Sequence, residues 1–109
     1  MYTYNADLVR VVDGDTLDVH IDLGFRVWHS CKVRLLGVNA PEIHKRAEME
    51  AGKAARLALI KHIDGRRLLV HTTKADDWQR WLGVVWIQGE KESLNDWLWR
   101  NGFARRADI

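Results

Sequence analysis

Three strand-like patterns precede the first helical pattern, and this order restricts the fold more than any other feature of the chain. Residues 8–12 are mostly apolar and end at an Asp13-Gly14 turn signal. Residues 17–22 alternate apolar and polar side chains, which is typical of a strand with one face in solvent. A β-branched and aromatic run over 25–36 follows. A ferredoxin-like fold needs a helix between its first two strands, and the sequence has no helical pattern there.

A helix and a second group of strands complete the pattern. The helical stripe consists of Ala51, Ala54, Ala55, Ala58, Leu59, His62 and Ile63. Residues 67–72 and 80–87 have strand character, and Ser93 to Asp96 resembles a capping box that opens a short helix. The order predicts a mainly β fold with α (α+β), namely a five-stranded OB-fold barrel. One helix lies between strands 3 and 4, and a short helix ends the chain. Residues 1–109 are expected to form a single domain.

Composition excludes several classes of protein. Apolar residues make up 47% of the chain and charged residues 29%, which is ordinary for a globular domain. Apolar runs fall far short of the ~20 residues of a membrane helix, so we expect no membrane partner. The start shows no signal-peptide pattern, so we expect cytoplasmic location, or action wherever the chain is made, unless it is a mature secreted form. Cys31 is the single cysteine, which argues against a disulfide or a Cys-type zinc site.

Net charge gives weak information about partners. The formal charge is +2, and the surplus of Lys and Arg lies in the second half of the chain. A solvated basic face explains this distribution as simply as attraction to phosphate does. The five histidines show no close ligand spacing such as His-x₃-His, so we expect surface or structural roles for them.

Two carboxylates and an amide belong to segments that the predicted strands bring together. Asp13 and Asp15 flank Gly14 between two strands, and Asn39 follows the third strand. Since the second and third strands are hairpin neighbours, Asp15 and Asn39 should emerge side by side, with Glu42 further along the loop. Oxygens placed in this way suit a hard cation. The simpler interpretation of each segment alone is an ordinary turn.

Two arginines are candidates for binding an anion beside these oxygens. Arg34 lies two residues before the end of the third strand, on the face opposite its apolar stripe. Arg80 begins a later strand. Two guanidinium groups directed at one site would suit a phosphoryl transition state, in which negative charge builds up. Each could equally be a surface arginine.

The motifs taken together resemble the staphylococcal nuclease (thermonuclease) family. The resemblance rests on Val12-Asp13-Gly14-Asp15-Thr16, Val33-Arg34-Leu35-Leu36-Gly37-Val38-Asn39-Ala40-Pro41-Glu42, Asp76 with Arg80, Leu94-Asn95 and Gly102-Phe103-Ala104. It covers the chain from about Leu8 to Ala104, with the motifs in the family's order. It implies an OB-fold and Ca²⁺-dependent hydrolysis of phosphodiester bonds in DNA, RNA or both.

The resemblance also implies a cation site. Asp15 would be a metal ligand, Asn39 would occupy a second ligand position, and the backbone carbonyl of Ala40 would supply another oxygen for Ca²⁺. Asp13 and Thr16 would support these ligands without touching the ion.

The remaining roles implied by the resemblance concern the reaction and the substrate. Glu42 would be the general base or would orient the attacking water. Arg34 and Arg80 would bind the scissile phosphate and stabilise its developing charge. Trp78 would stack on a sugar or a base.

The sequence departs from the family pattern at three places, which leaves a second interpretation open. Asn39 stands where the family usually has Asp, and Asp77 where it often has a basic residue. The chain also ends at Ile109, without the family's last helix. The first interpretation is a metal-dependent nuclease. The alternative is a catalytically impaired module that binds nucleic acid or a protein partner without cleaving it.

Overall fold

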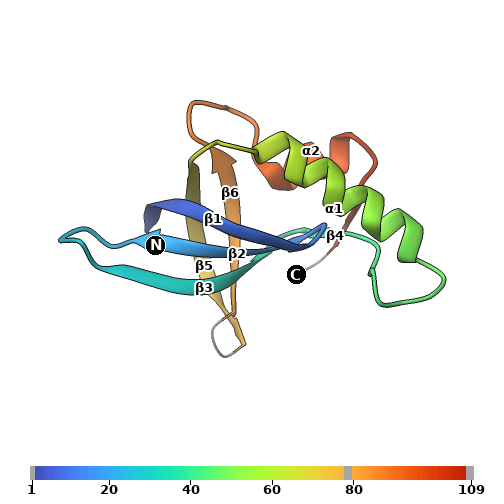
Figure 1. Cartoon of the computed structure of the whole chain (residues 1–109), viewed down its shortest axis with the longest axis horizontal. Helices are drawn as coiled ribbons and strands as arrows, with labels where there is room; N and C mark the ends of the chain where they lie inside the picture. Colours follow the sequence, from blue (N-terminus) through green and yellow to red (C-terminus); the bar gives the residue numbers. More distant parts are fainter. Residues whose placement is uncertain (1, 78–79, 108–109) are drawn as a thin grey trace.

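The computed structural model describes residues 2–77 and 80–107, and it is mainly β with two helices (Figure 1). The elements are β1 (Thr3–Asp13), β2 (Thr16–Asp22), β3 (Trp28–Leu35), β4 (Val38–Asn39), α1 (Met49–Ile63), β5 (Leu68–Asp77), β6 (Arg80–Ile87), α2 (Leu94–Arg100) and β7 (Arg105–Arg106). Five strands close into a barrel in the order β1-β2-β3-β6-β5. The predicted α+β barrel, with α1 between its third and fourth strands, is confirmed.

The barrel closes through one parallel contact and four antiparallel ones. Strand β1 pairs with β2 along most of its length, and its first residues pair with β5. Strand β1 therefore starts at Thr3, five residues before the apolar run that predicted it. The parallel pair is β3 with β6, in which Arg34 lies opposite Leu82.

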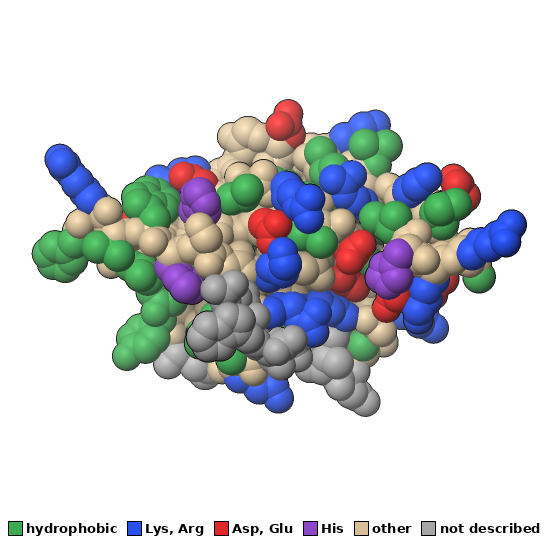
Figure 2. Space-filling view, turned by 60° about the horizontal axis from the view of Figure 1, so that its bottom comes forward, with side chains coloured by type: hydrophobic (Ala, Val, Ile, Leu, Met, Phe, Trp, Pro, Cys, Tyr) green, Lys and Arg blue, Asp and Glu red, His purple; other side chains and the backbone are tan. Residues whose placement is uncertain are grey.

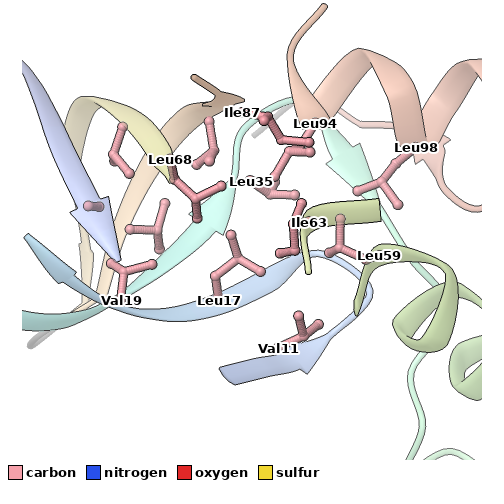
Figure 3. Close-up of a cluster of buried hydrophobic side chains, with 14 of the residues drawn as sticks. Val11, Leu17, Val19, Leu35, Leu59, Ile63, Leu68, Ile87, Leu94 and Leu98 are labelled. Carbon is pink, nitrogen blue, oxygen red and sulfur yellow. The ribbon is translucent and has the colours of Figure 1, made fainter. Parts of the chain in front are cut away.

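The core fills the barrel and continues under the helices (Figure 3). Leu17 and Val19 of β2 and Leu35 of β3 point inward and are almost fully buried. Leu59 and Ile63 of α1 pack against the same cluster. The alternation that predicted β2 is thus the alternation between core and solvent. Full burial of each such side chain contributes roughly 1.5–3 kcal/mol to folding.

Helix α1 buries a narrower face than its alanine stripe predicted. Ala55, Leu59 and Ile63 are buried as expected, whereas Ala51 and Ala54 are exposed. Gly52 is buried instead. A Cβ added at Gly52 would lie 2.8 Å from the carbonyl oxygen of Pro41, so only glycine lets the helix approach the 41–43 segment this closely.

Asn95 attaches α2 to the barrel through backbone groups. Its side-chain amide donates to the carbonyl oxygens of Leu36 (2.8 Å) and Gly83 (3.2 Å), and its Oδ1 accepts from the Val85 amide (3.2 Å). The predicted cap is present, because the Ser93 hydroxyl accepts from the Asp96 amide at 3.1 Å. Buried polar groups of this kind fix how two elements sit on each other.

A small second sheet was missed by the sequence patterns. Strand β4 pairs antiparallel with β7, with Val38 opposite Arg106 and Asn39 opposite Arg105. The guanidinium of Arg106 lies 3.9 Å from the ring centre of Trp99. This sheet holds the segment that begins at Asn39 against residues 105–106.

Each helix among the described residues is too short or too polar to cross a bilayer.

Candidate active site

A polar pocket of about 160 Å³ opens where the β1–β2 turn, the end of β3, the 39–44 segment and the start of β6 meet. Its lining consists of Asp13, Asp15, Thr16, Arg34, Asn39, Ala40, Pro41, Glu42, His44 and Arg80. The structure thus gathers around one pocket every described residue for which the sequence suggested a site role. Trp78 lies outside the described residues.

Asp15 is the buried anion of the pocket. One carboxylate oxygen accepts from the Thr16 hydroxyl at 3.0 Å, and the other accepts from the backbone amide of Ala40 at 2.8 Å. The same second oxygen lies 3.5 Å from a guanidinium nitrogen of Arg34. The Asp15 residue is only 8% exposed. These contacts connect the β1–β2 turn with the strand end and the loop that face it.

Gly14 allows the turn to sit between the helix and the loop. A Cβ at Gly14 would lie 2.8 Å from the Cβ of Ala55 and 2.9 Å from the Cβ of Ala40. Contacts this short require something to shift. Helix α1 and the loop therefore pack closely on the two sides of the turn, which leaves room for glycine and not for a larger residue.

Arg34 is held by backbone oxygens as well as by side chains. One guanidinium nitrogen donates to the carbonyl oxygens of Leu35 (3.0 Å) and Val38 (2.8 Å). The other donates to Oδ1 of Asn39. With the Asp15 contact, the guanidinium bridges two residues that the sequence predicted as cation ligands. These contacts fix the orientation of the guanidinium, and a guanidinium in a fixed orientation suits recognition of an oxyanion by its remaining N–H groups.

The oxygens available to a cation are suitable in kind but low in charge. Asp15 supplies one carboxylate, Asn39 one amide oxygen and Ala40 one backbone carbonyl, and Ca²⁺ accepts all three kinds of oxygen. Within residues 2–77 and 80–107, no group of three or more His, Cys, Asp and Glu side chains could hold a metal ion. Arg34 also contacts the oxygens of Asp15 and Asn39. The oxygens present are therefore of the kinds that a hard cation accepts, but only one of them carries a carboxylate charge.

Glu42 is the accessible carboxylate at the mouth of the pocket. Its side chain is 44% exposed, and Oε2 lies 3.0 Å from Nε2 of His44 and 3.5 Å from Nζ of Lys45. Its backbone amide donates to the Glu48 carboxylate at 3.2 Å. The sequence predicted a surface or structural role for His44, and its nearness to Glu42 in the chain was the one signal for the contact that the structure shows.

Arg80 and Asp13 complete the lining. Arg80 starts β6 and lies opposite Lys32 of β3. Asp13 ends β1 opposite Thr16, which is buried beside Asp15. These positions are compatible with the roles predicted for Arg80, Asp13 and Thr16. Those roles stay predictions.

Comparison with known proteins identifies the family. Residues 32–109, more than half of the chain, match the model described as "Staphylococcal nuclease homologue". The chain belongs to this family. The matched region contains Arg34, Asn39, Glu42 and Arg80.

Two curated relatives extend beyond the present chain. Protein ParB of Escherichia coli is 38% identical over 88 residues, which cover 81% of this chain and 45% of that protein. An uncharacterized protein of Methanocaldococcus jannaschii, MJ1439, is 29% identical over 126 residues, covering 94% of this chain and 58% of the relative. The chain spans about half the length of the curated relatives it matches.

Proposed function

We propose that this staphylococcal nuclease homologue is a metal-dependent phosphodiesterase that hydrolyses DNA, RNA or both. The observation that carries the proposal is the position of Arg34. Two backbone carbonyls hold its guanidinium, which faces a pocket that also contains Asp15, Asn39 and Glu42. Pre-organised donors of this kind stabilise charge that develops in a transition state, and they need no rearrangement when the reaction occurs.

Glu42 is the proposed general base. Its carboxylate is accessible to water, and it lies at the edge of the same pocket as the two arginines. In the proposed reaction it accepts a proton from a water molecule, whose oxygen attacks phosphorus in line with the departing oxygen. Arg34 and Arg80 bind the non-bridging oxygens, on which negative charge increases. His44 and Lys45 orient the carboxylate from the solvent side.

Asp15, Asn39 and the carbonyl oxygen of Ala40 are the proposed ligands of Ca²⁺. The ion would supply positive charge next to the phosphate. Asn39 contributes no charge of its own, so we expect weak affinity. Thr16 and the Ala40 amide hold the Asp15 carboxylate in place through hydrogen bonds.

A second candidate function is nucleic-acid binding without cleavage. The contacts of Arg34 with Asp15 and Asn39 favour it, because the guanidinium already neutralises the single buried carboxylate of the candidate cation site. A module of this kind would still attract phosphate through Arg34 and Arg80. Its affinity would fall as salt rises, since phosphate contacts release counterions.

One experiment separates the two functions. A labelled single-stranded oligonucleotide is mixed with the protein in Ca²⁺ or in EDTA, and each sample is analysed for bound and for cleaved strand. The nuclease proposal expects cleavage in Ca²⁺ and none in EDTA. Salt-sensitive binding with an intact strand in both buffers would reject the nuclease and support the binding module.

A further inference from the structure

The outer face of β2 and β3 forms a continuous path away from the site pocket. Residues opposite each other on these strands share a face, and the outward pairs are Thr16 with Arg34, Asp18 with Lys32, His20 with Ser30 and Asp22 with Trp28. The first pair belongs to the site pocket and the last lies next to the hairpin tip. The distance along β3 from Arg34 to Trp28 is about 20 Å at the usual rise of ~3.3 Å per residue.

A groove lies along the middle of this path. Its volume is about 410 Å³, against about 160 Å³ for the site pocket. Asp18, His20, Ser30 and Lys32 line it, and Val9 of β1 bounds it. Val19 and Cys31 also line the groove, so its wall is part polar and part apolar, and the groove lies over the middle of the two strands.

Cationic side chains extend from the site pocket into this groove. Lys32 lies opposite Arg80 on the neighbouring strand β6, so the two side chains share the outer face. Asp18 accepts from Arg10 at 3.1 Å and from Lys32 at 2.8 Å. Burial alone would raise the pKa of Asp18, but these hydrogen bonds outweigh it and hold the pKa below its usual value. Two cations thus flank one carboxylate, so these three side chains together carry one net positive charge.

Aromatic and aliphatic side chains cover the far end of the path. Phe25 is fully exposed, Trp28 is 48% exposed, and Leu23 and Val27 are also exposed. Phe25 and Arg26 both have positive φ angles, of 54° and 60°, although neither is glycine. Both are central residues of the hairpin turn that the hydrogen bond from the Val27 amide to the Gly24 carbonyl closes, and a type I′ turn requires positive φ at these two positions.

Figure 2 shows one face of the molecule. Lys and Arg side chains gather near its centre among Asp and Glu side chains, and hydrophobic side chains cover the protrusion at its left end. The protrusion is the β2–β3 hairpin, which extends beyond the barrel in Figure 1.

We propose that the outer face of β2 and β3 is a binding track for single-stranded nucleic acid, running from Arg34 to a stacking platform at Trp28 and Phe25. The proposal extends the proposed function, since it assumes that the pocket at Arg34 receives a phosphate. Lys32 and Arg10 contact phosphates in the groove, and the two aromatic rings stack on bases. The track is long enough for about six nucleotides at the ~3.4 Å spacing of stacked bases.

The arrangement favours a nucleic acid over a bilayer or a second copy of the chain. Cations at phosphate-binding positions followed by aromatic rings form the combination that binds single strands without sequence preference. A bilayer touching the hairpin tip would leave the groove unfilled. The groove and the site pocket are both lined by residues of β2 and β3, so one extended ligand along these strands reaches the pocket, the groove and the aromatic end.

The test measures binding in EDTA, which separates affinity from cleavage. Fluorescence anisotropy gives the Kd of oligodeoxythymidylates from two to about sixteen nucleotides, a series that includes the ~4–16 nucleotides of OB-fold sites. Affinity should rise with length and then level off. Trp28→Ala should weaken binding of the longest strand about 5- to 100-fold and leave the dinucleotide unchanged. Lys32→Gln should lower the salt dependence by about one phosphate contact.

Trp99→Ala is the matched control. The exposed fraction of Trp99, 45%, is similar to the 48% of Trp28. Trp99 lies on α2 beside Arg106, away from the track. The Trp99→Ala variant should bind strands of every length as tightly as the unmodified chain does. Thermal melting of each variant checks folding. Substitution of exposed side chains such as Trp28 and Phe25 should leave the fold intact.

The outcomes separate the track from the nuclease proposal. A chain that cleaves nothing in Ca²⁺ but binds long strands through Trp28 in EDTA refutes the nuclease and supports the track. Equal loss of long-strand affinity in Trp28→Ala and Trp99→Ala would overturn the track, as would unchanged affinity in Trp28→Ala. Binding to anionic phospholipid vesicles that Phe25→Ser abolishes, with oligonucleotide affinity unchanged, would also overturn it.

Discussion

The two halves of the candidate site are built in different ways. On the barrel side, the side chains of Asp15 and Arg34 are 11% and 13% exposed, and backbone groups hold both. On the loop side, the Glu42 side chain is 44% exposed and contacts His44 and Lys45, which are themselves largely exposed. One half is fixed by strands and a helix, whereas the other is open to water.

This difference matches the two tasks in the proposed reaction. Groups that stabilise developing charge are most effective when they are already in place, because they then need no reorganisation. A general base must reach water, and partial exposure serves that purpose. Changes on the barrel side should therefore affect both the stability of the fold and the stabilisation of developing charge. Changes on the loop side should affect the rate of the reaction and have little effect on folding.

Removal of the base should have the largest effect. Glu42→Gln keeps the size of the side chain but abolishes its capacity to accept a proton, so cleavage in Ca²⁺ should slow about 100- to 10,000-fold. The melting temperature should hardly change, since surface substitutions usually cost less than ~0.5 kcal/mol. Gel analysis of cleavage under single-turnover conditions measures the rate.

Glu50→Gln provides the control for this prediction. Glu50 is an exposed carboxylate in the first turn of α1 and lies outside the pocket lining. It should cleave at the rate of the unmodified chain. Similar rates for Glu42→Gln and Glu50→Gln would remove Glu42 from the mechanism.

Loss of the buried carboxylate should have the largest effect on stability. Asp15→Ala leaves the Ala40 amide without its acceptor and takes the anion away from Arg34, which should cost about 2–3 kcal/mol. Glu42→Ala should cost less than ~0.5 kcal/mol. Urea unfolding followed by tryptophan fluorescence compares the two. Equal losses in the free energy of unfolding for the two variants would mean that the barrel side is held no more firmly than the loop side.

Crowding at the β1–β2 turn tests how the barrel side is held. Gly14→Ala places a Cβ within 3 Å of Ala55 and Ala40, so the turn must move away from helix or loop. We expect a loss of about 1–3 kcal/mol in the free energy of unfolding. Gly89→Ala serves as a reference, because a Cβ there meets no atom within 4 Å and only the positive φ opposes it. If Gly14→Ala unfolds at the urea concentration of the unmodified chain, the turn is not compressed.

Restoring charge at the weak ligand position should have the smallest effect. Asn39→Asp adds a second carboxylate for Ca²⁺, but Arg34 already contacts this side chain and would pair with the new charge. We therefore expect the Ca²⁺ concentration for half-maximal cleavage to fall about tenfold, or ~1.4 kcal/mol, rather than by the full Coulomb term. An unchanged Ca²⁺ requirement would show that position 39 is not a ligand.

Most of the fold followed from the sequence because each long element buries one face. The alternation in 17–22 and the single order of strands and helices were sufficient to predict the barrel. Strand β1 was predicted too short, because the prediction began at the apolar run, although Tyr4 and Ala6 already alternate with polar residues before it. The pair β4–β7 was missed because strands of two residues contain no period to detect.

The candidate site was likewise predicted only in part from the sequence. The hairpin register places Arg34 opposite Thr16, so its proximity to Asp15 followed from counting residues along two strands. The contact between Glu42 and His44 did not follow, because loop side chains have no periodicity. Nor did the bond from Arg34 to the Val38 carbonyl, which depends on how the chain turns after β3.

The most direct test of the account concerns Arg34, where the two halves of the site meet. Cleavage of a labelled single strand at saturating Ca²⁺ is compared for the unmodified chain, Arg34→Ala and Arg56→Ala, with thermal melts of each. Arg56 also donates to a backbone carbonyl, that of Val11, but lies outside the pocket lining. We predict that Arg34→Ala cleaves about 100- to 1,000-fold more slowly, while Arg56→Ala cleaves normally. Full cleavage by folded Arg34→Ala would contradict the assignment of this pocket as the active site.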